Sequence, residues 1–179
     1  MHKLSTMNFF EFIFQDWRAN ASSSKGRVIM LLFRIANFCA TSKRYYYIGI
    51  PYLVFYKILV EWFFSIEIPW RMKAGRGLCI YHGQGLVINS QVVIGNYCTL
   101  RHCTTIGNKQ KKGGGMTGSP VIGNYVDVGS NVCIIGDIHI GDHVTIGCGS
   151  VVTKTCPANI VVAGNPAAEI KKRMEVIVA

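Results

Sequence analysis

The chain has 179 residues, a length that suits one domain or a small helical cap joined to a larger unit. Its 19 lysines and arginines exceed its 9 aspartates and glutamates, so the net charge is +10 and an anionic partner is favoured. The basic residues accompany no nucleic-acid-binding motif, which argues against nucleic-acid binding. The seven cysteines form no CxxC pair, which argues against a disulfide framework and a metal site and indicates a reduced, cytoplasmic protein.

The first 66 residues are rich in apolar and aromatic side chains at helical spacing. We expect a short amphipathic helix over residues 8–20, a second helix over 25–42, and a third from Pro51 to about Ser65. This region is predicted to cap a solenoid or to pack against sister subunits, with contact to a membrane surface as the alternative.

None of these apolar stretches reads as a signal peptide or a membrane span. Glu11 and Asp16 interrupt the first stretch, so it does not resemble a cleavable signal. Arg34 breaks the second, and Lys57 and Glu61 break the third, whereas a spanning helix needs roughly 20 uncharged apolar residues.

From residue 88 onward an aliphatic residue recurs every six positions. An α-helix has a period near 3.6 and a simple strand a period of 2, so this pattern predicts a β-helix, in which three short strands form each triangular coil. Glycine often follows the aliphatic residue, and we expect these glycines to turn the corners with positive φ. The repeated positions are Ile88, Ile94, Leu100 and Ile106, then Ile122, Val128, Ile134, Ile140, Ile146 and Val152.

The repeat is interrupted once. The distance from Ile106 to Ile122 is sixteen residues, which is not a multiple of six, and residues 108–120 read NKQKKGGGMTGSP. This glycine- and lysine-rich segment is predicted to leave the prism as a loop, either at a binding site or as a surface excursion. Farther on, residues 169–173 are expected to form a short basic helix.

His82 stands six positions before Ile88, in a slot where the repeat predicts an aliphatic residue. Such local violations concentrate at functional sites, and imidazole suits general-base chemistry near neutral pH. The alternative is a structural histidine of the wall.

Three motifs resemble the left-handed β-helix acyltransferases, specifically the serine acetyltransferase-like branch. They are GRGLCIYHGQGLVI at 75–88, GSVV at 149–152 and AGNPA at 163–167. The likeness to the acetyltransferase of colanic-acid biosynthesis is closer still. It includes RHCTTIGN at 101–108 and extends into the N-terminal helices with QDWRAN at 15–20. This resemblance implies a mainly β fold, a left-handed parallel β-helix with an N-terminal α-helical cap. It divides the chain into a helical region (1–66), the β-helix (67–168, with loop 108–120) and a tail (169–179).

The resemblance also implies roles for individual residues. His82 would be the general base and Glu67 the carboxylate that orients it, in place of the aspartate of serine acetyltransferases. Tyr81, His102 and Ser119 would face the acceptor. Where serine acetyltransferases carry an aspartate before the histidine and an Arg-His pair at the loop's end, this chain has Tyr81 and Gly118-Ser119. The loss of a charged partner for a carboxylate favours a sugar hydroxyl over free serine.

Acetyl-CoA would be the co-substrate, lying between neighbouring prisms of a homotrimer, with no metal required. The residues implicated by position are Gly107, Asn108, Gly129, Ser130, Gly147, Lys154 and Lys172. The expected function is therefore acetyl transfer to a sugar of a surface-polysaccharide precursor, in the cytoplasm or at the inner face of the membrane. Serine acetylation for cysteine biosynthesis and a non-catalytic β-helix scaffold are the alternatives.

Overall fold

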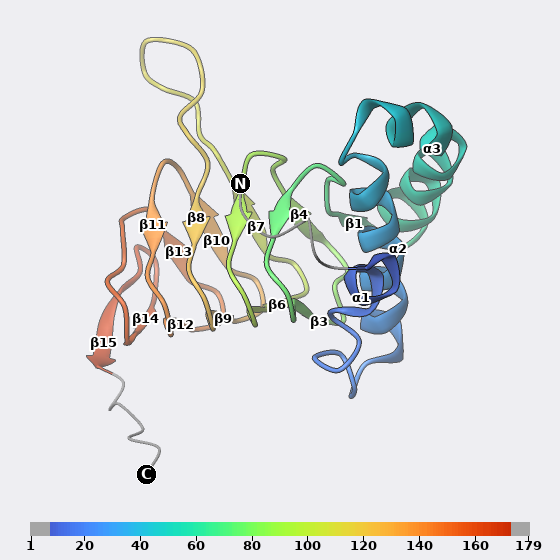
Figure 1. The fold of residues 1–179 in the computed structure, drawn as a ribbon. Helices are drawn as coiled ribbons and strands as arrows, with labels where there is room; N and C mark the ends of the chain where they lie inside the picture. The colour runs from blue at the N-terminus through green and yellow to red at the C-terminus, as the bar shows by residue number, and fades with distance from the viewer. Residues whose placement is uncertain (1–7, 173–179) are drawn as a thin grey trace.

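The computed structural model describes residues 8–172, which form a triangular β-solenoid closed at one end by helices (Figure 1). About five coils wind as a left-handed parallel β-helix. Three sheets form the sides of the prism, and we name them A, B and C in the order in which the chain meets them. The C–A, A–B and B–C edges are the corners between these sheets.

Each sheet is built from strands of successive coils. Sheet A contains β1 (Ile66–Glu67), β4 (Leu86–Ile88), β7 (Thr105–Gly107), β10 (Cys133–Ile135) and β13 (Val151–Val152). Sheet B contains β2 (Lys73–Ala74), β5 (Val93–Ile94), β8 (Val121–Ile122) and β11 (His139–Ile140). Sheet C contains β3 (Cys79–Tyr81), β6 (Thr99–Arg101), β9 (Asp127–Val128), β12 (Thr145–Ile146), β14 (Ile160–Ala163) and β15 (Ala168–Lys172).

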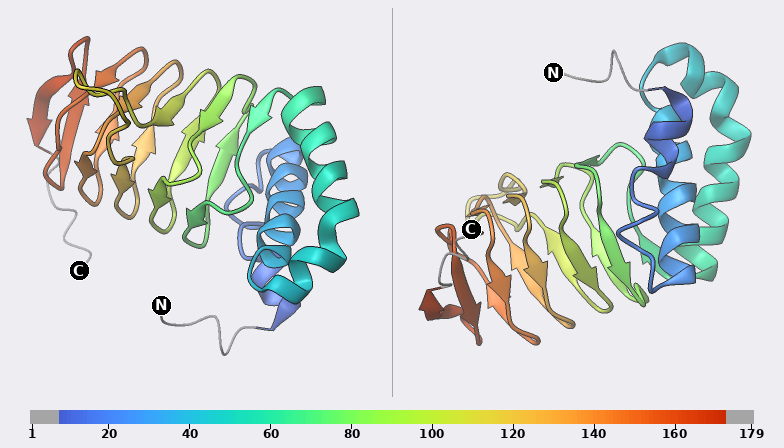
Figure 2. Two further views of the ribbon diagram at one scale, coloured as in Figure 1. Left: turned by 90° about the horizontal axis from the view of Figure 1, so that it is seen from above. Right: turned by 60° about the horizontal axis from the view of Figure 1, so that its bottom comes forward.

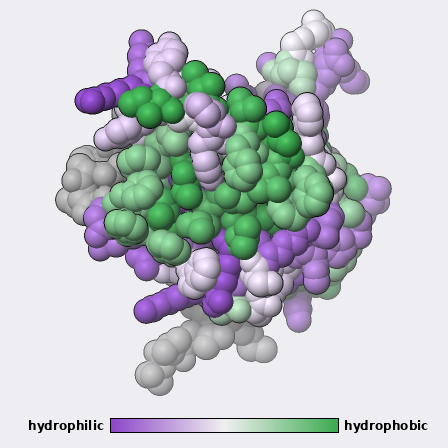
Figure 3. Space-filling model, turned by 90° about the vertical axis from the view of Figure 1, so that its right-hand side faces the viewer, coloured by the Kyte–Doolittle hydropathy of each residue, from purple (hydrophilic) through white to green (hydrophobic). Residues whose placement is uncertain are grey.

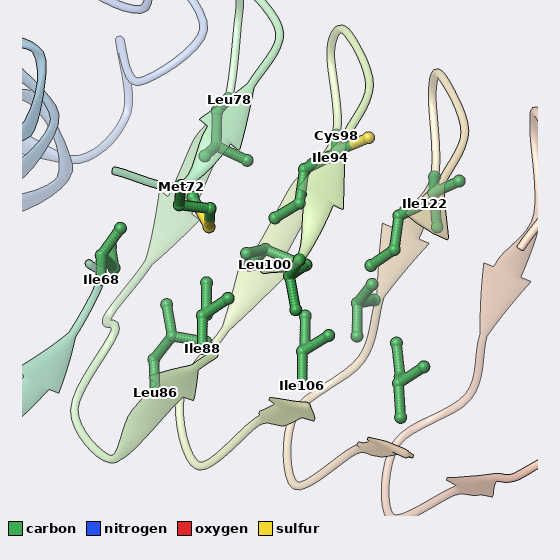
Figure 4. Packing of buried hydrophobic residues seen from close by; sticks show 14 of the residues in the cluster. Ile68, Met72, Leu78, Leu86, Ile88, Ile94, Cys98, Leu100, Ile106 and Ile122 are labelled. Atoms are coloured by element: carbon green, nitrogen blue, oxygen red, sulfur yellow. The ribbon is translucent and has the colours of Figure 1, made fainter. Parts of the chain in front are cut away.

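The predicted aliphatic repeat is confirmed as the core of the prism. All ten repeat positions are at most 2% exposed. Figure 4 shows the side chains of five of them pointing into the prism: Ile88, Ile94, Leu100, Ile106 and Ile122. Each buried side chain of this size contributes roughly 1.5–3 kcal/mol by leaving water. The repeat therefore sets both the fold and its main stabilising term.

Strand register shows where coils depart from three hexads. Ile122 pairs with Ile140, eighteen positions on, but Ile80 pairs with Leu100, twenty positions on. Ile94 pairs with Ile122, twenty-eight positions on, because the predicted loop 108–120 lies between β7 and β8. This loop projects from the prism in Figure 1, and an isolated antiparallel bridge between Gln110 and Met116 joins its two sides.

The expectation that the repeat glycines adopt positive φ is wrong. Positive φ occurs instead at non-glycine corner residues such as Tyr97, Tyr125 and His143, and at glycines outside the repeat such as Gly77 and Gly149. The repeat glycines instead allow close approach of the next coil: a Cβ on Gly141 would lie 2.5 Å from the nitrogen of Ala158, and one on Gly129 would lie 2.6 Å from that of Cys148. Coil-to-coil spacing, not corner geometry, requires glycine there.

The cap comprises α1 (Phe9–Phe14), α2 (Ser24–Cys39), α3 (Lys43–Tyr56) and the π-helical η1 (Lys57–Phe63) that continues α3. The third helix was predicted to begin at Pro51, but it begins at Lys43, where the Ser42 side chain caps it by accepting from the Tyr45 N–H. None of the helices in the described range is long and apolar enough to cross a membrane.

A buried ion pair fastens the cap to the first coils. Arg34 bonds Asp16 at 2.6 Å and also donates to the carbonyl oxygens of Ala74 and Gly75. Asp16 and Asn20 accept from the N–H groups of Leu78 and Ile80. These contacts satisfy strand groups that a solenoid end would otherwise leave unpaired, and the helices stack across this end in Figure 2.

The expected helix at 169–173 is wrong for the described residues: β15 runs antiparallel to β14 and ends sheet C, while Arg173 lies outside the described range. Because β14 is the last parallel strand, its outer backbone groups need a partner, and β15 supplies one.

Candidate functional site

His82 lies at the C–A edge of the first coils, directly after β3. Its side chain is exposed, and its φ is 66°. The prediction that it occupies an interior aliphatic slot is wrong, because Ile80 fills that slot and is fully buried. The corner from 82 to 85 accounts for the two extra residues of this coil, so His82 stands outside the regular wall.

Local hydrogen bonds hold this corner. The N–H of Gly83 donates to the Tyr81 carbonyl at 2.8 Å, and that of Gly85 donates to Ser65 at 2.8 Å. The Gln84 side-chain amide lies between the His82 carbonyl and the Lys25 Nζ. The amide orientation that satisfies both neighbours donates to the His82 carbonyl at 2.6 Å and accepts from the Lys25 Nζ at 2.8 Å. Burial lowers the pKa of Lys25. The cap thus reaches the backbone of His82, a connection that sequence reasoning missed although Gln84 lies within the quoted motif.

His102 lies beside His82 in the next coil. The ring centroids are 5.9 Å apart at an interplanar angle of 76°. Among residues 8–172, the Nδ1 of His102 is a buried side-chain polar atom without a hydrogen-bond partner. The structure therefore brings together two predicted histidines and leaves one of them with an unused polar atom.

Tyr81 is the neighbour of His82 on β3, and its side chain is engaged within the protein. Its hydroxyl accepts from the Ser22 Oγ at 3.1 Å, and the Arg101 guanidinium lies 5.7 Å from its ring centroid. Arg101 in turn bonds Asp127 at 2.5 Å. Tyr81 thus links the cap to an ion pair on sheet C.

Glu67 is exposed at the end of β1, beside Val87 of β4. Within the described range, no hydrogen bond or ion pair joins Glu67 to His82. Its charge acts on Glu61, whose pKa is raised mainly by burial, with Lys57 opposing and Glu67 adding to the rise. The orienting role of Glu67 stays a prediction.

Other candidate residues share the C–A edge. Gly129, Ser130 and Gly147 follow β9 and β12, one and two coils beyond His102. The N–H groups of Gly129 and Gly147 already donate to the carbonyls of Ile146 and Val162, and Gly129 is buried against the next coil, so these two positions offer no free main-chain donors.

Cys148 was not predicted, and it stands on this edge as an exposed thiol whose pKa is lowered by hydrogen bonds with Ser130.

The remaining candidates lie elsewhere. Gly107, Asn108, Ser119 and Lys154 are at the A–B edge, where the Ser119 Oγ donates to the Asn89 Oδ1 at 3.1 Å. Lys172 ends β15 on sheet C. Within one chain, the predicted site residues therefore lie mainly at two different edges of the prism.

Several known proteins share this architecture, although no protein-family model matches the chain. The chain is 40% identical over 157 residues to the putative colanic acid biosynthesis acetyltransferase WcaB of Escherichia coli K12, covering 86% of this chain and 95% of that protein. The crystal structure of the Neisseria gonorrhoeae serine acetyltransferase matches with a TM-score of 0.75 and 27% identity, over 93% of this chain and 66% of that one.

A third match is the Brucella abortus serine acetyltransferase in complex with coenzyme A, with a TM-score of 0.75 and 25% identity. That match covers 92% of this chain and 68% of that one. The chain thus spans nearly the whole length of the first relative but only about two thirds of these two serine acetyltransferase chains.

Proposed function

Because the chain belongs to the hexapeptide-repeat acetyltransferases of the serine acetyltransferase-like branch, we propose that it moves the acetyl group of acetyl-CoA to a sugar hydroxyl in surface-polysaccharide biosynthesis. The observation that carries this proposal is the exposed His82 imidazole at a corner shared with His102. The relative that this chain covers over 95% of its length is named for colanic acid biosynthesis, and this supports a sugar acceptor.

His82 acts as the general base. It removes the proton of the acceptor hydroxyl as the oxygen attacks the thioester carbonyl carbon, and the carbon–sulfur bond then breaks. The departing thiolate takes the proton from the imidazolium, so the enzyme returns to its starting state. The bond from Gln84 to the His82 carbonyl fixes the backbone from which the ring projects. Glu67 is the carboxylate that orients the ring and stabilises the imidazolium.

Acetyl-CoA supplies the activated acetyl group. The C–A edge suits its approach because Ser130 offers a partly exposed hydroxyl there and the partly exposed Gly147 carries no side chain. Lys154 at the A–B edge and Lys172 on β15 supply positive charge for its phosphates.

The division of these residues between two edges supports a trimer in which the C–A edge of one prism meets the A–B edge of the next. Ser119 of one chain then joins His82 of its neighbour at one acceptor site. Mixing His82→Ala chains with Ser119→Phe chains should restore part of the activity that neither variant has alone. If no mixing ratio restores activity, the proposal of a site shared between chains is wrong.

A panel of acceptors tests the proposed substrate. Release of free coenzyme A thiol is measured with nucleotide sugars, oligosaccharides and free serine, for the wild type, His82→Ala and the matched variant His139→Ala on sheet B. We expect turnover on a sugar, its loss in His82→Ala, and its retention in His139→Ala. Turnover on serine above all sugars would establish the alternative below, and absence of acetyl-CoA binding by calorimetry would favour a scaffold.

Serine acetylation is the second candidate, since the fold likeness to two serine acetyltransferases extends over 92–93% of this chain. Against it stands Ser119, which is 8% exposed and whose hydroxyl donates to the Asn89 amide oxygen. A free amino-acid carboxylate gains no charged partner from this residue.

A further inference from the structure

The outward side of the cap carries an apolar surface that the solenoid does not use. We call it the cap face and define it by the exposed large apolar residues of α3 and η1. They are Tyr45, Tyr47, Ile48, Ile50, Val54, Phe55, Ile58, Trp62 and Phe63, with exposures from 41% to 75%. Figure 3 views the molecule from this side and shows a continuous apolar area with hydrophilic residues around it.

The fold does not require this surface. The opposite side of α3 and η1 is already buried against α2 and the first coil through Leu53, Tyr56 and Val60, all at most 3% exposed. A helix at the end of a domain normally turns charged residues to solvent. Residues 45–56 contain no charge at all. A large contiguous apolar surface of this kind marks an interaction site.

Basic residues border the cap face. Lys43 and Arg44 begin α3, and Arg71 lies 5.0 Å from the ring centroid of Tyr46 on the same helix. Lys25 lies 5.3 Å from the ring centroid of Phe64, just beyond η1. Each of these positions places a cation beside aromatic side chains.

The acidic residues near this border are few. Glu61 has a side chain only 18% exposed, and it pairs with Lys57 at 3.8 Å. Glu67 is exposed on β1. The border is therefore basic in balance, as is the whole chain at +10.

We propose that the cap face docks on a membrane surface rich in anionic phospholipid. Aromatic and aliphatic side chains enter the interfacial region while the basic border meets the headgroup phosphates, which is the arrangement of interfacial helices. A second copy of the chain fits less well, because a face-to-face pair would bring two basic borders together. The proposal does not rest on the acetyl-transfer reaction.

The orientation of the cap face suits such docking. The face closes the end of the solenoid, so it looks outward along the prism axis (Figures 1 and 3). Parallel prisms in the proposed trimer would present three cap faces to one plane. His82 belongs to the coils next to the cap, and Lys25 reaches its corner through Gln84. A lipid-linked acceptor would thus lie near the candidate base.

Vesicle co-sedimentation of the full chain tests the proposal. The probes are phosphatidylcholine vesicles with and without 30–40% phosphatidylglycerol, roughly the anionic content that gives a strong surface potential. We expect binding to anionic vesicles that weakens as salt is raised. Trp62→Ser with Phe63→Ser should weaken binding at least tenfold, and Ile48→Ser severalfold.

A matched control is Ile170→Ser, which removes an isoleucine 63% exposed on β15, at the far end of the solenoid from Ile48, which is 70% exposed. It should bind vesicles as the wild type does, and circular dichroism should show every variant folded. Absence of vesicle binding, or equal binding by all variants, would overturn the proposal. So would a fall in particle size of Ile48→Ser without any vesicle binding by the wild type, which would assign the cap face to a second copy.

Discussion

The B–C and C–A edges of the same prism are built from the same repeat but differ in how their corner residues contact one another. At the B–C edge, Tyr97, Tyr125 and His143 stack in successive coils, with centroid distances of 5.3 and 4.8 Å. Beside them, Asn124 accepts from Asn96 at 2.9 Å, and Asp142 accepts from Asn124 at 2.7 Å. Each of these residues thus contacts the residue at the equivalent position of the next coil.

The C–A edge has no such uniform ladder. Gln84, His102, Ser130 and Cys148 occupy its stacked positions and carry different side-chain chemistry. The carbonyls of Gln84, His102 and Ser130 accept from the N–H groups of Cys103, Asn131 and Gly149 in the next coil. Its first corner holds two extra residues, and it contains the unpartnered Nδ1 of His102. One edge is built for stability, and the other leaves polar groups available for a ligand.

The largest expected effect separates the two edges by their histidines. His82→Ala should lower acetyl transfer by about 10²–10⁴-fold, the usual contribution of a general base, and leave the melting temperature unchanged because the ring is exposed. His143→Ala, at the B–C edge, should leave transfer unchanged and lower the melting temperature, because it removes a stacked ring worth about 0.5–1.5 kcal/mol. Rates and thermal unfolding of both variants check this, and a reversed pattern would contradict the division of roles.

Gly141→Ala tests whether the close spacing of the coils requires glycine at this position. The new Cβ would lie 2.5 Å from the Ala158 nitrogen and 2.8 Å from its Cα, so the coils must move apart. We expect a loss of about 1–3 kcal/mol in the free energy of unfolding, measured by denaturant titration. Gly113→Ala in the projecting loop is the control, since nothing lies within 4 Å of its added Cβ. Equal stability of the two variants would refute the spacing explanation.

Thiol labelling probes the C–A edge. Hydrogen bonds with Ser130 lower the pKa of Cys148, whereas burial raises the pKa of Cys98 to about 11. At pH 7.5 iodoacetamide should therefore modify Cys148 severalfold faster than the exposed Cys103 and leave Cys98 unmodified, as peptide mass spectrometry would show. Ser130→Ala should slow modification of Cys148 alone; unchanged labelling would show that Ser130 does not activate this thiol.

Acid titration tests the B–C ladder and has the smallest expected effect. Backbone and side-chain hydrogen bonds from Asn124 lower the pKa of Asp142 in the folded state. Stability from a depressed carboxyl pKa is present above the unfolded value of about 3.9 and is lost as pH falls through the folded value. Between pH 5 and pH 3, the melting temperature of the wild type should fall by more than that of Asp142→Asn. Identical losses would show that the bond contributes nothing measurable.

Much of the fold was predictable because each interior position depends on residues six apart. Ile122, Val128 and Ile134 are buried in three different sheets, as the repeat requires. The loop at 108–120 was predictable for the same reason, since a polar glycine-rich segment cannot fill an interior slot. The candidate site was predictable only in its residue types. His82 was selected by a spacing that the structure reassigns to Ile80, so the position of its side chain outside the wall was not foreseen.

The amino-acid pattern by itself determined the solenoid, its core and the place where the chain leaves the wall. Tertiary structure decided which residues meet at each edge, because those contacts join residues eighteen, twenty or twenty-eight positions apart according to the insertions in each coil. It also decided that the end of sheet C binds β15 as a strand and that the helices leave an apolar cap face. Local periodicity specifies which side chains leave water, whereas the neighbours of an exposed corner depend on the length of every coil beneath it.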